Sequence, residues 1–485
     1  MKNCEDSFIG KTFDDFLLRP QMGVVATRKQ VDLTMAVSSK LSISLPIIAS
    51  NMDTVTGAKM MQAMSLEGAF AILHRNCGIL EQVTMVRSVK KQHSHIVENP
   101  LIISPDETIA DAIKLTEEHN ISGLLIEEKK GSRVLVGILS RRDLEFAKSM
   151  NAFHEKAIGF KGLQWPLTIN YANVPMDVAE KMMLDSRVEK LPLVDTDGRI
   201  VGLITLKDLR AVKQKPYSSK DAKGRLLVGA AIGATGDFME RAQELVSAGV
   251  DCVVIDIAHA HSVVVKQAIE KFKKKFENTE LICGNIATAE AAEFLLNLGV
   301  DAIKVGIGPG MGCRTRLETG FGVPQLQAIR EVYLAVNGQI PIIADAGMKN
   351  DKDFFLAIAC GASSVMSGGI FAGTDESPGK IITDPATGQK FKIYRGMTSP
   401  EAVIANVPEE EMTERLSTPA EGQSAKIPYV GSVKNILERI RGHLQSAVSY
   451  SGEQSLMAAH KKIAADPGKY FILLSEAAKK ESYIR

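Results

Sequence analysis

The sequence predicts an α/β fold in which a (β/α)8 TIM barrel is interrupted by a smaller inserted domain. Three observations lead to this prediction: eight short apolar runs are each followed by a segment of helical periodicity, the runs close on polar residues or glycine, and a long interruption contains an internal repeat. Continuous apolar strands that alternate with helices are typical of a parallel sheet covered on both faces. Eight of them favour a closed barrel, and an open doubly wound sheet is the alternative.

The eight runs fall into two groups along the chain. Two precede the interruption and six follow it, in the order PIIAS (46–50), AFAIL (69–73), LLVGAA (226–231), CVVID (252–256), LICGN (281–285), AIKVG (302–306), PIIAD (341–345) and SSVMSG (363–368). Chemistry in such barrels occurs at the carboxyl ends of the strands. Polar residues and glycines stand at or just past these ends: Ser50, Asn51, Asp53, Asp256, Asn285, Gly306, Asp345 and Gly368.

The interruption divides the chain into three stretches: 1–96, the first part of the barrel; 97–215, the insert; and 216–485, the second part of the barrel with a flap and a C-terminal segment. Within the insert, SGLLIEEKKGSRVLVGILSRRDL and EKLPLVDTDGRIVGLITLKDL each predict strand, turn, strand and the start of a helix. Each repeat has a hydroxyl and a carboxylate at this helix start, as Ser140 with Asp143 and Thr205 with Asp208. Such a pair suits a helix capping box as well as a ribose, and the pattern by itself favours the cap.

Composition limits the classes of partner. The chain is 45% apolar and 24% charged with a formal net charge of +1, so no overall field favours nucleic acid or acidic membranes. It begins with acids where a signal peptide is apolar, and no run approaches the about 18 to 20 apolar residues of a membrane span. Six cysteines without a CxxC pair indicate free thiols in a reducing compartment. We therefore expect a cytoplasmic protein that binds no nucleic acid and no membrane; the C-terminal SYIR is not a clear peroxisomal signal, and a peroxisome-like organelle stays open.

The loop after the sixth run, KVGIGPGMGCRTRLETG (304–320), predicts a nucleophile. Its glycines allow left-handed turns and close approach to a ligand, and exposed amides or carbonyls of this kind hold a phosphate or a monovalent cation. Arg314 and Arg316 beside Cys313 favour the thiolate. The alternative is a glycine-rich turn with an exposed thiol, which is prone to oxidation.

Two later loops predict a phosphate and ribose site. Asp345 ends the seventh run and Gly347 follows it, and Gly368 with Gly369 begins the helix after the eighth run. Loops after the seventh and eighth strands commonly bind phosphate in barrels of this kind. Asp345 is well placed to accept hydrogen bonds from a ribose.

Seven segments resemble motifs of the IMP dehydrogenase and GMP reductase family: NMDTVTG, DIAHAHS, GNIATAEAA, GIGPGMGCRTRLETGFGVPQ, IADAGM, SGGIFAGTDESPG and YRGM. The resemblance extends over nearly the whole chain, including the insert. The resemblance implies a barrel that binds a purine nucleoside monophosphate, GMP or IMP, and a nicotinamide cofactor, with Cys313 attacking purine C2. The insert resembles a tandem CBS (Bateman) domain, which implies regulatory purine nucleotides at Ser140, Asp143, Thr205 and Asp208.

The resemblance assigns further roles to matching positions of this chain. It implies substrate contacts at Ser50, Met52, Asp345, Gly347, Gly368, Gly369, Tyr394, Gly396 and Met397. It implies cofactor contacts at Asp256, Ser262, Asn285 and Thr288, and a potassium ion on the backbone carbonyls of Gly306, Gly308 and Cys313. The family forms homotetramers that stack into octamers, so we expect one of these assemblies.

The two branches of the family differ after a shared thioimidate on the cysteine. A dehydrogenase hydrolyses this adduct with an Arg-Tyr pair on a flap, and the corresponding segment here, 396–422, has Arg415 followed by Leu416 and no tyrosine. Asn51, the double glycine 368–369 and STPAEGQSAKIPYVG resemble the reductase, which implies that Thr315 and Glu421 handle the proton that expels ammonia. The sequence therefore favours an NADPH-dependent GMP reductase that makes IMP.

Other features keep two alternatives open. YRGM and the insert look more like IMP dehydrogenase, which oxidises IMP to XMP with NAD. Met311 and Arg314 replace the family's usual serine and threonine, which weakens the phosphate assignment at this loop and adds positive charge beside the thiol. A nucleotide sensor without activity is the third hypothesis, and the intact set of Cys313, Thr315 and Glu421 argues against it.

Overall fold

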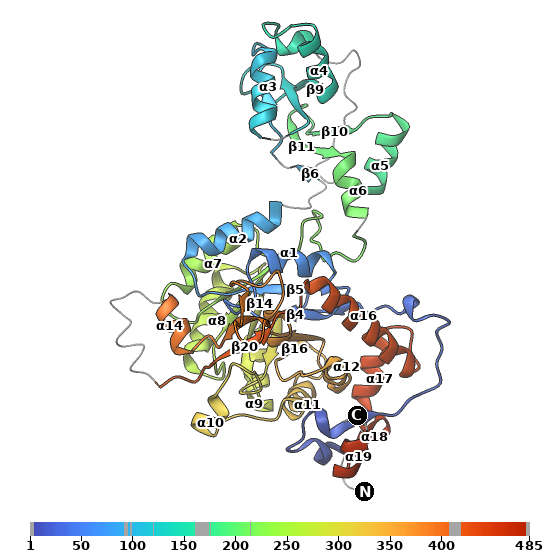
Figure 1. The fold of residues 1–485 in the computed structure, drawn as a ribbon, viewed down its shortest axis with the longest axis vertical. Helices are drawn as coiled ribbons and strands as arrows, with labels where there is room; N and C mark the ends of the chain where they lie inside the picture. The colour runs from blue at the N-terminus through green and yellow to red at the C-terminus, as the bar shows by residue number, and fades with distance from the viewer. Residues whose placement is uncertain are drawn as a thin grey trace. The chain divides into compact units, whose positions relative to one another are not determined.

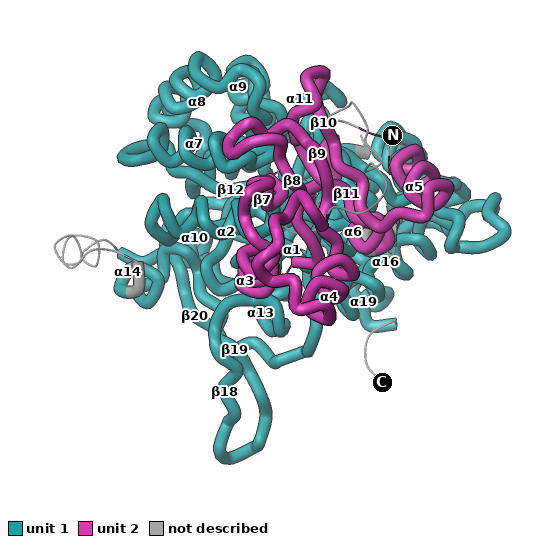
Figure 2. The backbone as a smooth tube through the Cα atoms, turned by 90° about the horizontal axis from the view of Figure 1, so that it is seen from above, with its two compact units in different colours: residues 1–91, 217–220, 226–485 teal, residues 92–216, 221–225 magenta. Residues whose placement is uncertain are grey.

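The computed structural model describes residues 4–91, 96–97, 99–119, 121–160, 174, 176–213, 215–406 and 419–481 (Figure 1). The chain divides into two compact units, coloured separately in Figure 2. Unit 1 comprises Met1–Lys91, Tyr217–Lys220 and Leu226–Arg485, and unit 2 comprises Gln92–Pro216 and Asp221–Arg225. No described helix is both long and apolar enough to cross a membrane.

Unit 1 is built on a closed parallel barrel with the strand order β12-β13-β14-β15-β16-β17-β4-β5. The strands are β4 (Ile47–Ala49), β5 (Phe70–Leu73), β12 (Gly229–Ile232), β13 (Cys252–Asp256), β14 (Glu280–Ile286), β15 (Ala302–Val305), β16 (Ile342–Asp345) and β17 (Ser364–Ser367). Each of the eight apolar runs contributes one strand. The predicted (β/α)8 barrel is therefore confirmed, and the open sheet is not what forms.

Helices surround the barrel (Figure 1). They are α1 (Ala58–Leu66), α2 (Ile79–Lys91), α7 (Phe238–Ser247), α8 (Val263–Lys275), α9 (Ala289–Asn297), α11 (Gln325–Val336), α12 (Asp351–Cys360) and the short α13 (Gly369–Ala372). The strands are buried on both faces, because successive residues alternate between two apolar clusters. In β4, Ile48 packs with the cluster that contains Val254 and Ile343, whereas Ile47 and Ala49 pack with the larger cluster that includes the helices.

Further elements of unit 1 lie outside the eight strand–helix repeats, and one of them, α10, lies between β15 and α11. The helices are α10 (Thr315–Thr319), α14 (Pro400–Asn406), α16 (Val433–Tyr450), α17 (Leu456–Ala465), α18 (Pro467–Tyr470) and α19 (Glu476–Glu481), and the strand pairs are β1 (Phe16–Leu18) with β21 (Phe471–Leu473) and β2 (Met35–Ala36) with β3 (Ser42–Ile43). A third sheet has the order β18 (Ile382–Thr383), β19 (Lys390–Arg395), β20 (Ser424–Pro428), and its β18–β19 hairpin projects from unit 1 in Figure 2. The antiparallel pairing of β19 with β20 sets Arg395 opposite Ser424. It therefore brings the residues that follow β19 beside those that precede β20.

Unit 2 contains two three-stranded sheets, β7-β8-β9 and β10-β11-β6. Its elements are β6 (Ile96–Val97), β7 (Ile102–Ile103), α3 (Ile109–Glu118), β8 (Gly123–Glu127), β9 (Leu135–Ser140), α4 (Arg141–Ser149), α5 (Met176–Asp185), β10 (Lys190–Val194), β11 (Ile200–Thr205) and α6 (Leu206–Lys213). Each half has two antiparallel strands followed directly by a helix, in the order that the repeated sequence predicts.

Candidate active site

The loop between β15 and α10 carries the predicted nucleophile. Gly306 has φ +148° and Gly308 has φ +84°, both in the range that favours glycine. A Cβ at Gly306 would lie 2.3 Å from the carbonyl oxygen of Asp345, so the loop starts in close contact with the end of β16. This approach holds the cysteine loop over the carboxyl end of the barrel.

Cys313 begins a chain of three side chains. Its Sγ donates to Oγ1 of Thr315 at 3.1 Å, and that hydroxyl donates to Oε2 of Glu421 at 2.7 Å. The backbone supports the chain, because the amide of Arg314 donates to the carbonyl of Glu421 at 2.7 Å and Cys313 forms a β-bridge with Gly422. The structure thus brings together the three residues that the sequence singled out as catalytic.

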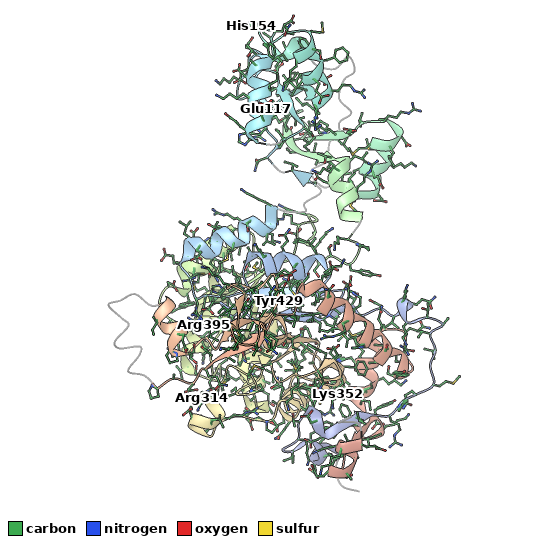
Figure 3. The ribbon with its side chains drawn as sticks, in the orientation of Figure 1. Glu117, His154, Arg314, Lys352, Arg395 and Tyr429 are labelled. Atoms are coloured by element: carbon green, nitrogen blue, oxygen red, sulfur yellow. The ribbon has the colours of Figure 1, made fainter. Side chains whose placement is uncertain are left out.

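The two arginines beside Cys313 have partners of their own. Arg314, labelled in Figure 3, pairs with Glu318 at 2.6 Å and donates to Gln423 Oε1 at 3.2 Å. Arg316 donates to the carbonyls of Ile307 and Val323. Burial lowers the pKa of Arg316, and the nearby Cys313 opposes this shift. Arg314 is the N-cap of α10 and Glu318 lies four positions later, so the carboxylate offsets part of the charge of Arg314.

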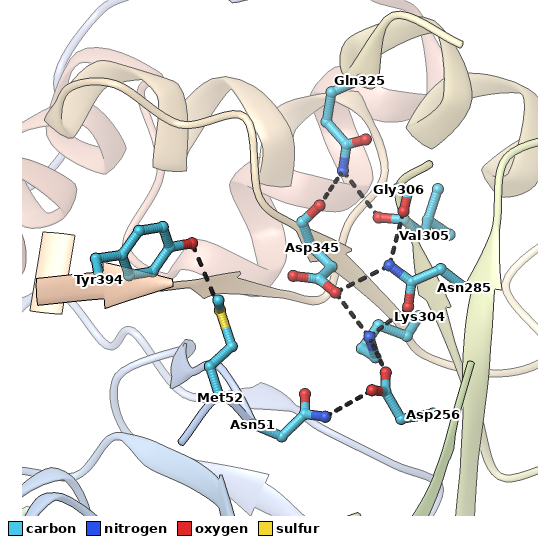
Figure 4. A network of polar contacts seen from close by, with 10 residues as sticks. All are labelled: Asn51, Met52, Asp256, Asn285, Lys304, Val305, Gly306, Gln325, Asp345 and Tyr394. Atoms are coloured by element: carbon cyan, nitrogen blue, oxygen red, sulfur yellow. Dashed lines mark hydrogen bonds and ion pairs between the residues drawn. The ribbon is translucent and has the colours of Figure 1, made fainter. Parts of the chain in front are cut away.

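A polar network crosses the mouth of the barrel (Figure 4). Lys304, in β15, places Nζ 2.7 Å from Oδ1 of Asp256 and 2.7 Å from Oδ2 of Asp345. Its side chain is 2% exposed. Burial alone would lower the pKa of Lys304, but the attraction of the two carboxylates outweighs burial and raises the pKa above its ordinary value. Lys304 therefore stays charged and holds two predicted ligand-binding residues in fixed positions.

Asn51 and Asn285 complete this network. Asn51 Nδ2 donates to Oδ2 of Asp256 at 2.8 Å, so both oxygens of that carboxylate have partners. Burial would raise the pKa of Asp256, yet Lys304 and these hydrogen bonds lower it overall. Asn285 Nδ2 donates to Asp345 at 3.0 Å and to the carbonyl of Gly306 at 2.7 Å. Asn285, predicted from the resemblance to contact the cofactor, thus serves to orient Asp345.

Predicted substrate contacts meet around Tyr394, at the end of β19. The Tyr394 hydroxyl lies 3.4 Å from Sδ of Met52, and a Cβ on Gly368 would lie 3.1 Å from both of these atoms. The amide of Ser50 donates to the carbonyl of Ser367 at 3.0 Å, which fixes β4 beside β17. Tyr394 is 4% exposed, and burial, followed by the charge of Asp345, raises its pKa to about 12. Its hydroxyl is therefore a neutral donor at physiological pH.

Glycine contacts join the remaining substrate loops to the cysteine loop. A Cβ on Gly396 would lie 2.3 Å from the carbonyl of Gly312, and the Gly396 amide donates to Gln423 at 2.9 Å. Met397 directly follows Gly396 in the sequence. Gly347 has φ +92°, and Gly369 opens α13 with a Cβ position 3.8 Å from Cε of Met311. Met311 therefore lies over the start of α13, where the family usually has a serine.

Ser262 and Thr288 cap helices that begin at the same end of the barrel. Ser262 Oγ accepts from the amide of Val265 at 3.3 Å at the start of α8, and Thr288 Oγ1 accepts from the amide of Ala291 at 3.3 Å at the start of α9. Both hydroxyls thus have a structural role beside the expected cofactor contact.

The paired residues of unit 2 are helix caps as well. Asp143 accepts from the amide of Ser140 at 2.7 Å in a reciprocal capping box, and Asp208 accepts from the hydroxyl of Thr205 at 2.6 Å. The capping role that the sequence pattern favoured is therefore present. Arg415 and Leu416, which carried the argument on the flap, lie outside the described residues.

Sequence reasoning missed Lys304 and Gln423. The run AIKVG predicts an apolar strand, although a lysine in a strand buried on both faces is itself a signal of a buried charge partner. Gln423 Nε2 donates to the carbonyl of Met311 at 2.8 Å and so joins the segment before β20 to the cysteine loop. No sequence signal predicts this contact, since it depends on the pairing of β19 with β20.

Comparison with known proteins gives consistent matches. A family model described as "IMP dehydrogenase / GMP reductase domain" matches residues 10–484. An inosine-5'-monophosphate dehydrogenase of Nitrosopumilus maritimus is 42% identical over 479 residues, covering 98% of this chain and 97% of the relative. One of Streptococcus pyogenes is 39% identical and covers 95% of this chain and 94% of the relative.

Solved structures also match. A cysteine-to-alanine variant of GMP reductase from Trypanosoma brucei, in complex with GMP, superposes with a TM-score of 0.81 at 35% identity and covers 100% of this chain and 99% of that chain. The same reductase in complex with GTP gives a TM-score of 0.72 at 33% identity, covering 97% and 99%. With the family model, the curated relatives and the solved structures in agreement, the chain belongs to the IMP dehydrogenase and GMP reductase family of oxidoreductases.

Proposed function

We propose that this protein is a GMP reductase, which converts GMP to IMP and ammonia with NADPH through a thioimidate on Cys313. The observation that carries the proposal is the chain from Cys313 through Thr315 to Glu421, with its distances of 3.1 and 2.7 Å. An amine leaves C2 only after protonation, and a carboxyl group acting through a hydroxyl supplies that proton. The chain therefore joins the nucleophile to the proton donor that deamination needs.

Cys313, Thr315 and Glu421 each have a defined role in the proposed reaction. The proton of the Cys313 thiol passes through Thr315 to Glu421, and the resulting thiolate forms a bond to C2 of GMP. Glu421 and Thr315 then return this proton to the exocyclic amine, which leaves as ammonia. NADPH, when bound, supplies the hydride that C2 then accepts. The carbon–sulfur bond breaks, IMP leaves, and Cys313 is a thiolate again. Asp345, held by Lys304 and Asn285, accepts hydrogen bonds from the ribose throughout.

The cofactor and the nucleotide would meet at the mouth of the barrel. Asp256, Ser262, Asn285 and Thr288 lie at the carboxyl ends of β13 and β14, where hydroxyl and amide groups suit a nicotinamide riboside. The ribose, phosphate and base of GMP are assigned to Ser50, Met52, Asp345, Gly347, Gly368, Gly369, Tyr394, Gly396 and Met397. The network through Lys304 lies between these two sets.

A potassium ion is proposed on the backbone carbonyls of Gly306, Gly308 and Cys313. Carbonyl oxygens suit this cation, and the left-handed conformations of the two glycines turn the backbone within the loop. The Gly306 carbonyl also accepts from Asn285, so the ion would share this ligand with the network. Among the described residues, no group of three His, Cys, Asp or Glu side chains is arranged as a metal site.

Unit 2 is proposed as a regulatory CBS pair that binds purine nucleotides at Ser140, Asp143, Thr205 and Asp208. The repeated strand–strand–helix order supports this proposal. The matched reductase that was solved with GTP gives a precedent for a nucleotide other than the substrate in a relative. We further propose a homotetramer or an octamer in the cytoplasm, to be tested by light scattering with and without GTP.

An absorbance assay tests the reaction. The full chain is mixed with GMP and NADPH in one cuvette and with IMP and NAD in another, and absorbance is followed at the nicotinamide band. Loss of NADPH with release of ammonia is expected. Formation of NADH with IMP alone would show instead that the protein is an IMP dehydrogenase, the second candidate, which the names of its curated relatives favour.

A further inference from the structure

Lys392 is a buried lysine beneath the loop that begins at α13. It lies in β19 and is 2% exposed. Its Nζ donates to the carbonyl of Thr374 at 2.7 Å, to the carbonyl of Ser377 at 2.8 Å and to Oγ of Ser377 at 3.1 Å. All three oxygens are neutral, so these contacts satisfy the donors of the ammonium group without neutralising its charge.

Lys392 and Tyr394 together hold both ends of one segment, residues 368–377. They lie two positions apart in β19 and therefore on the same face of the strand. Tyr394 packs at Gly368, where α13 begins, while Lys392 binds the carbonyls beyond its end. Ser377 strengthens the second attachment, because its hydroxyl donates to Ala372 at 2.7 Å. The two residues thus fix the segment to which the phosphate was assigned.

The acidic side chains next to Lys392 are bonded elsewhere. Asp375 accepts from the hydroxyl of Tyr429 at 2.7 Å. Glu376 accepts from Ser432 Oγ at 2.7 Å and from the amide of Val433 at 2.8 Å. Burial lowers the pKa of Lys392. The negative charges of Asp375 and Glu376 oppose this shift, whereas the positive charge of Lys59 lowers the pKa further.

A buried ammonium group without a bonded carboxylate costs stability, and a neutral side chain of the same length would avoid this cost. The positive charge of Lys392 offsets this loss of stability only where it attracts a bound anion. The phosphate is assigned to Gly368 and Gly369, at the start of the segment whose far end Lys392 binds through the carbonyls of Thr374 and Ser377.

We propose that Lys392 is a positioning residue that holds the segment 368–377 in place and supplies positive charge to the phosphate of the bound nucleotide. The proposal rests on the proposed function, since it takes a nucleoside monophosphate as the ligand. Lys392 acts through the loop and touches no reacting atom. Its effect therefore belongs to nucleotide binding and not to the chemical step.

The substitution Lys392→Met tests this proposal in the full-length protein, with Lys390→Met as the matched control. Lys390 lies in the same strand with its side chain exposed. For K392M we expect the KM for GMP to rise about tenfold or more, the affinity change that about 1.4 kcal/mol produces, with kcat and the KM for NADPH within about twofold of the wild type. K390M should change none of the three. An unchanged KM, or an equal fall in kcat, would overturn the proposal.

Calorimetric titration with GMP separates this proposal from the reaction. If the wild type binds GMP but consumes no NADPH, the proposed reaction is wrong and the Kd of K392M still decides the role of Lys392. If K392M does not fold, Ser377→Ala removes one of the three acceptors while leaving the charge, and we expect the Kd for GMP to weaken about twofold to threefold. An unchanged Kd in S377A would then count against the proposal.

Discussion

At the scale of single residues, Thr315 decides whether the cysteine and the carboxylate act together. Its hydroxyl accepts from Cys313 and donates to Glu421, so one oxygen atom carries both contacts. A hydroxyl with both contacts is placed to relay a proton between the thiol and the carboxylate, as the proposed reaction requires. The chemistry proposed above therefore depends on a group that is neither the nucleophile nor the acid.

Replacing Thr315 by valine keeps the shape of the side chain and removes the relay. We expect kcat for GMP to fall about 100-fold, the lower range for loss of acid–base assistance, with the KM for GMP little changed. Thr319→Val is the control, because Thr319 is exposed and its hydroxyl contacts neither Cys313 nor Glu421: it donates to the carbonyl of Thr315 and accepts from the amide of Phe321. Steady-state rates of NADPH loss measure both variants, and a T315V rate within about threefold of the wild type would exclude the relay.

At the scale of elements, the site forms where three segments that are distant in sequence come together. The cysteine loop contacts the turn after β19 through Gly312 and Gly396, and the residues before β20 pair with both. The contacts are backbone to backbone, with a Cβ position of Gly396 only 2.3 Å from the Gly312 carbonyl. Because Gly312 and Gly396 have no side chains, the cysteine loop and the turn after β19 can approach this closely.

Gly396→Ala tests this packing. The added methyl group must push the cysteine loop away from the turn, so we expect a fall in kcat/KM for GMP of about 100-fold, as follows when reacting groups are displaced by about 1 Å. Gly442→Ala is the matched control: its Cβ meets nothing within 4 Å in α16, and alanine there should raise the free energy of unfolding by about 0.5 to 1 kcal/mol without changing activity. Rates and urea unfolding measure both. Full activity in G396A would show that the loop tolerates displacement.

The barrel strands were predictable because their apolar runs are short, continuous and separated by helical segments. Cys313, Thr315 and Glu421 were predictable through resemblance to known motifs, although their contacts were not. Lys392 escaped prediction, since the sequence of β19 does not show that its ammonium group lies buried among carbonyls. Lys304 stands within an apolar strand, which signals a buried charge, but the sequence does not show which carboxylates neutralise it. Such residues are identified only when pairing of distant strands fixes their neighbours.

At the scale of the whole molecule, packing of the outer helices on the barrel makes unit 1 sensitive to acid. His460, in α17, has Nδ1 2.8 Å from the carbonyl of Ile358 in α12 and packs edge-on against Tyr333 in α11. His74 directly follows β5 and is 7% exposed. Burial lowers the pKa of both imidazoles below the ordinary value of 6.5. Both are therefore neutral in the folded protein under conditions in which the unfolded chain takes up protons.

This difference fixes the sign of the pH dependence. Between the lowered pKa of the folded state and 6.5, the unfolded chain binds more protons, so the free energy of unfolding rises with pH in this window and falls as the solution is acidified below about 6.5. Urea unfolding followed by circular dichroism from pH 7.5 to 5 measures the slope. His460→Gln keeps a donor for Ile358 and removes one titrating group, so its slope should be shallower by up to about 1.4 kcal/mol per pH unit. If the free energy of unfolding has the same pH slope in the wild type and in His460→Gln, His460 takes up its proton in the folded state, through a local separation of the outer helices, and does not contribute to the pH dependence.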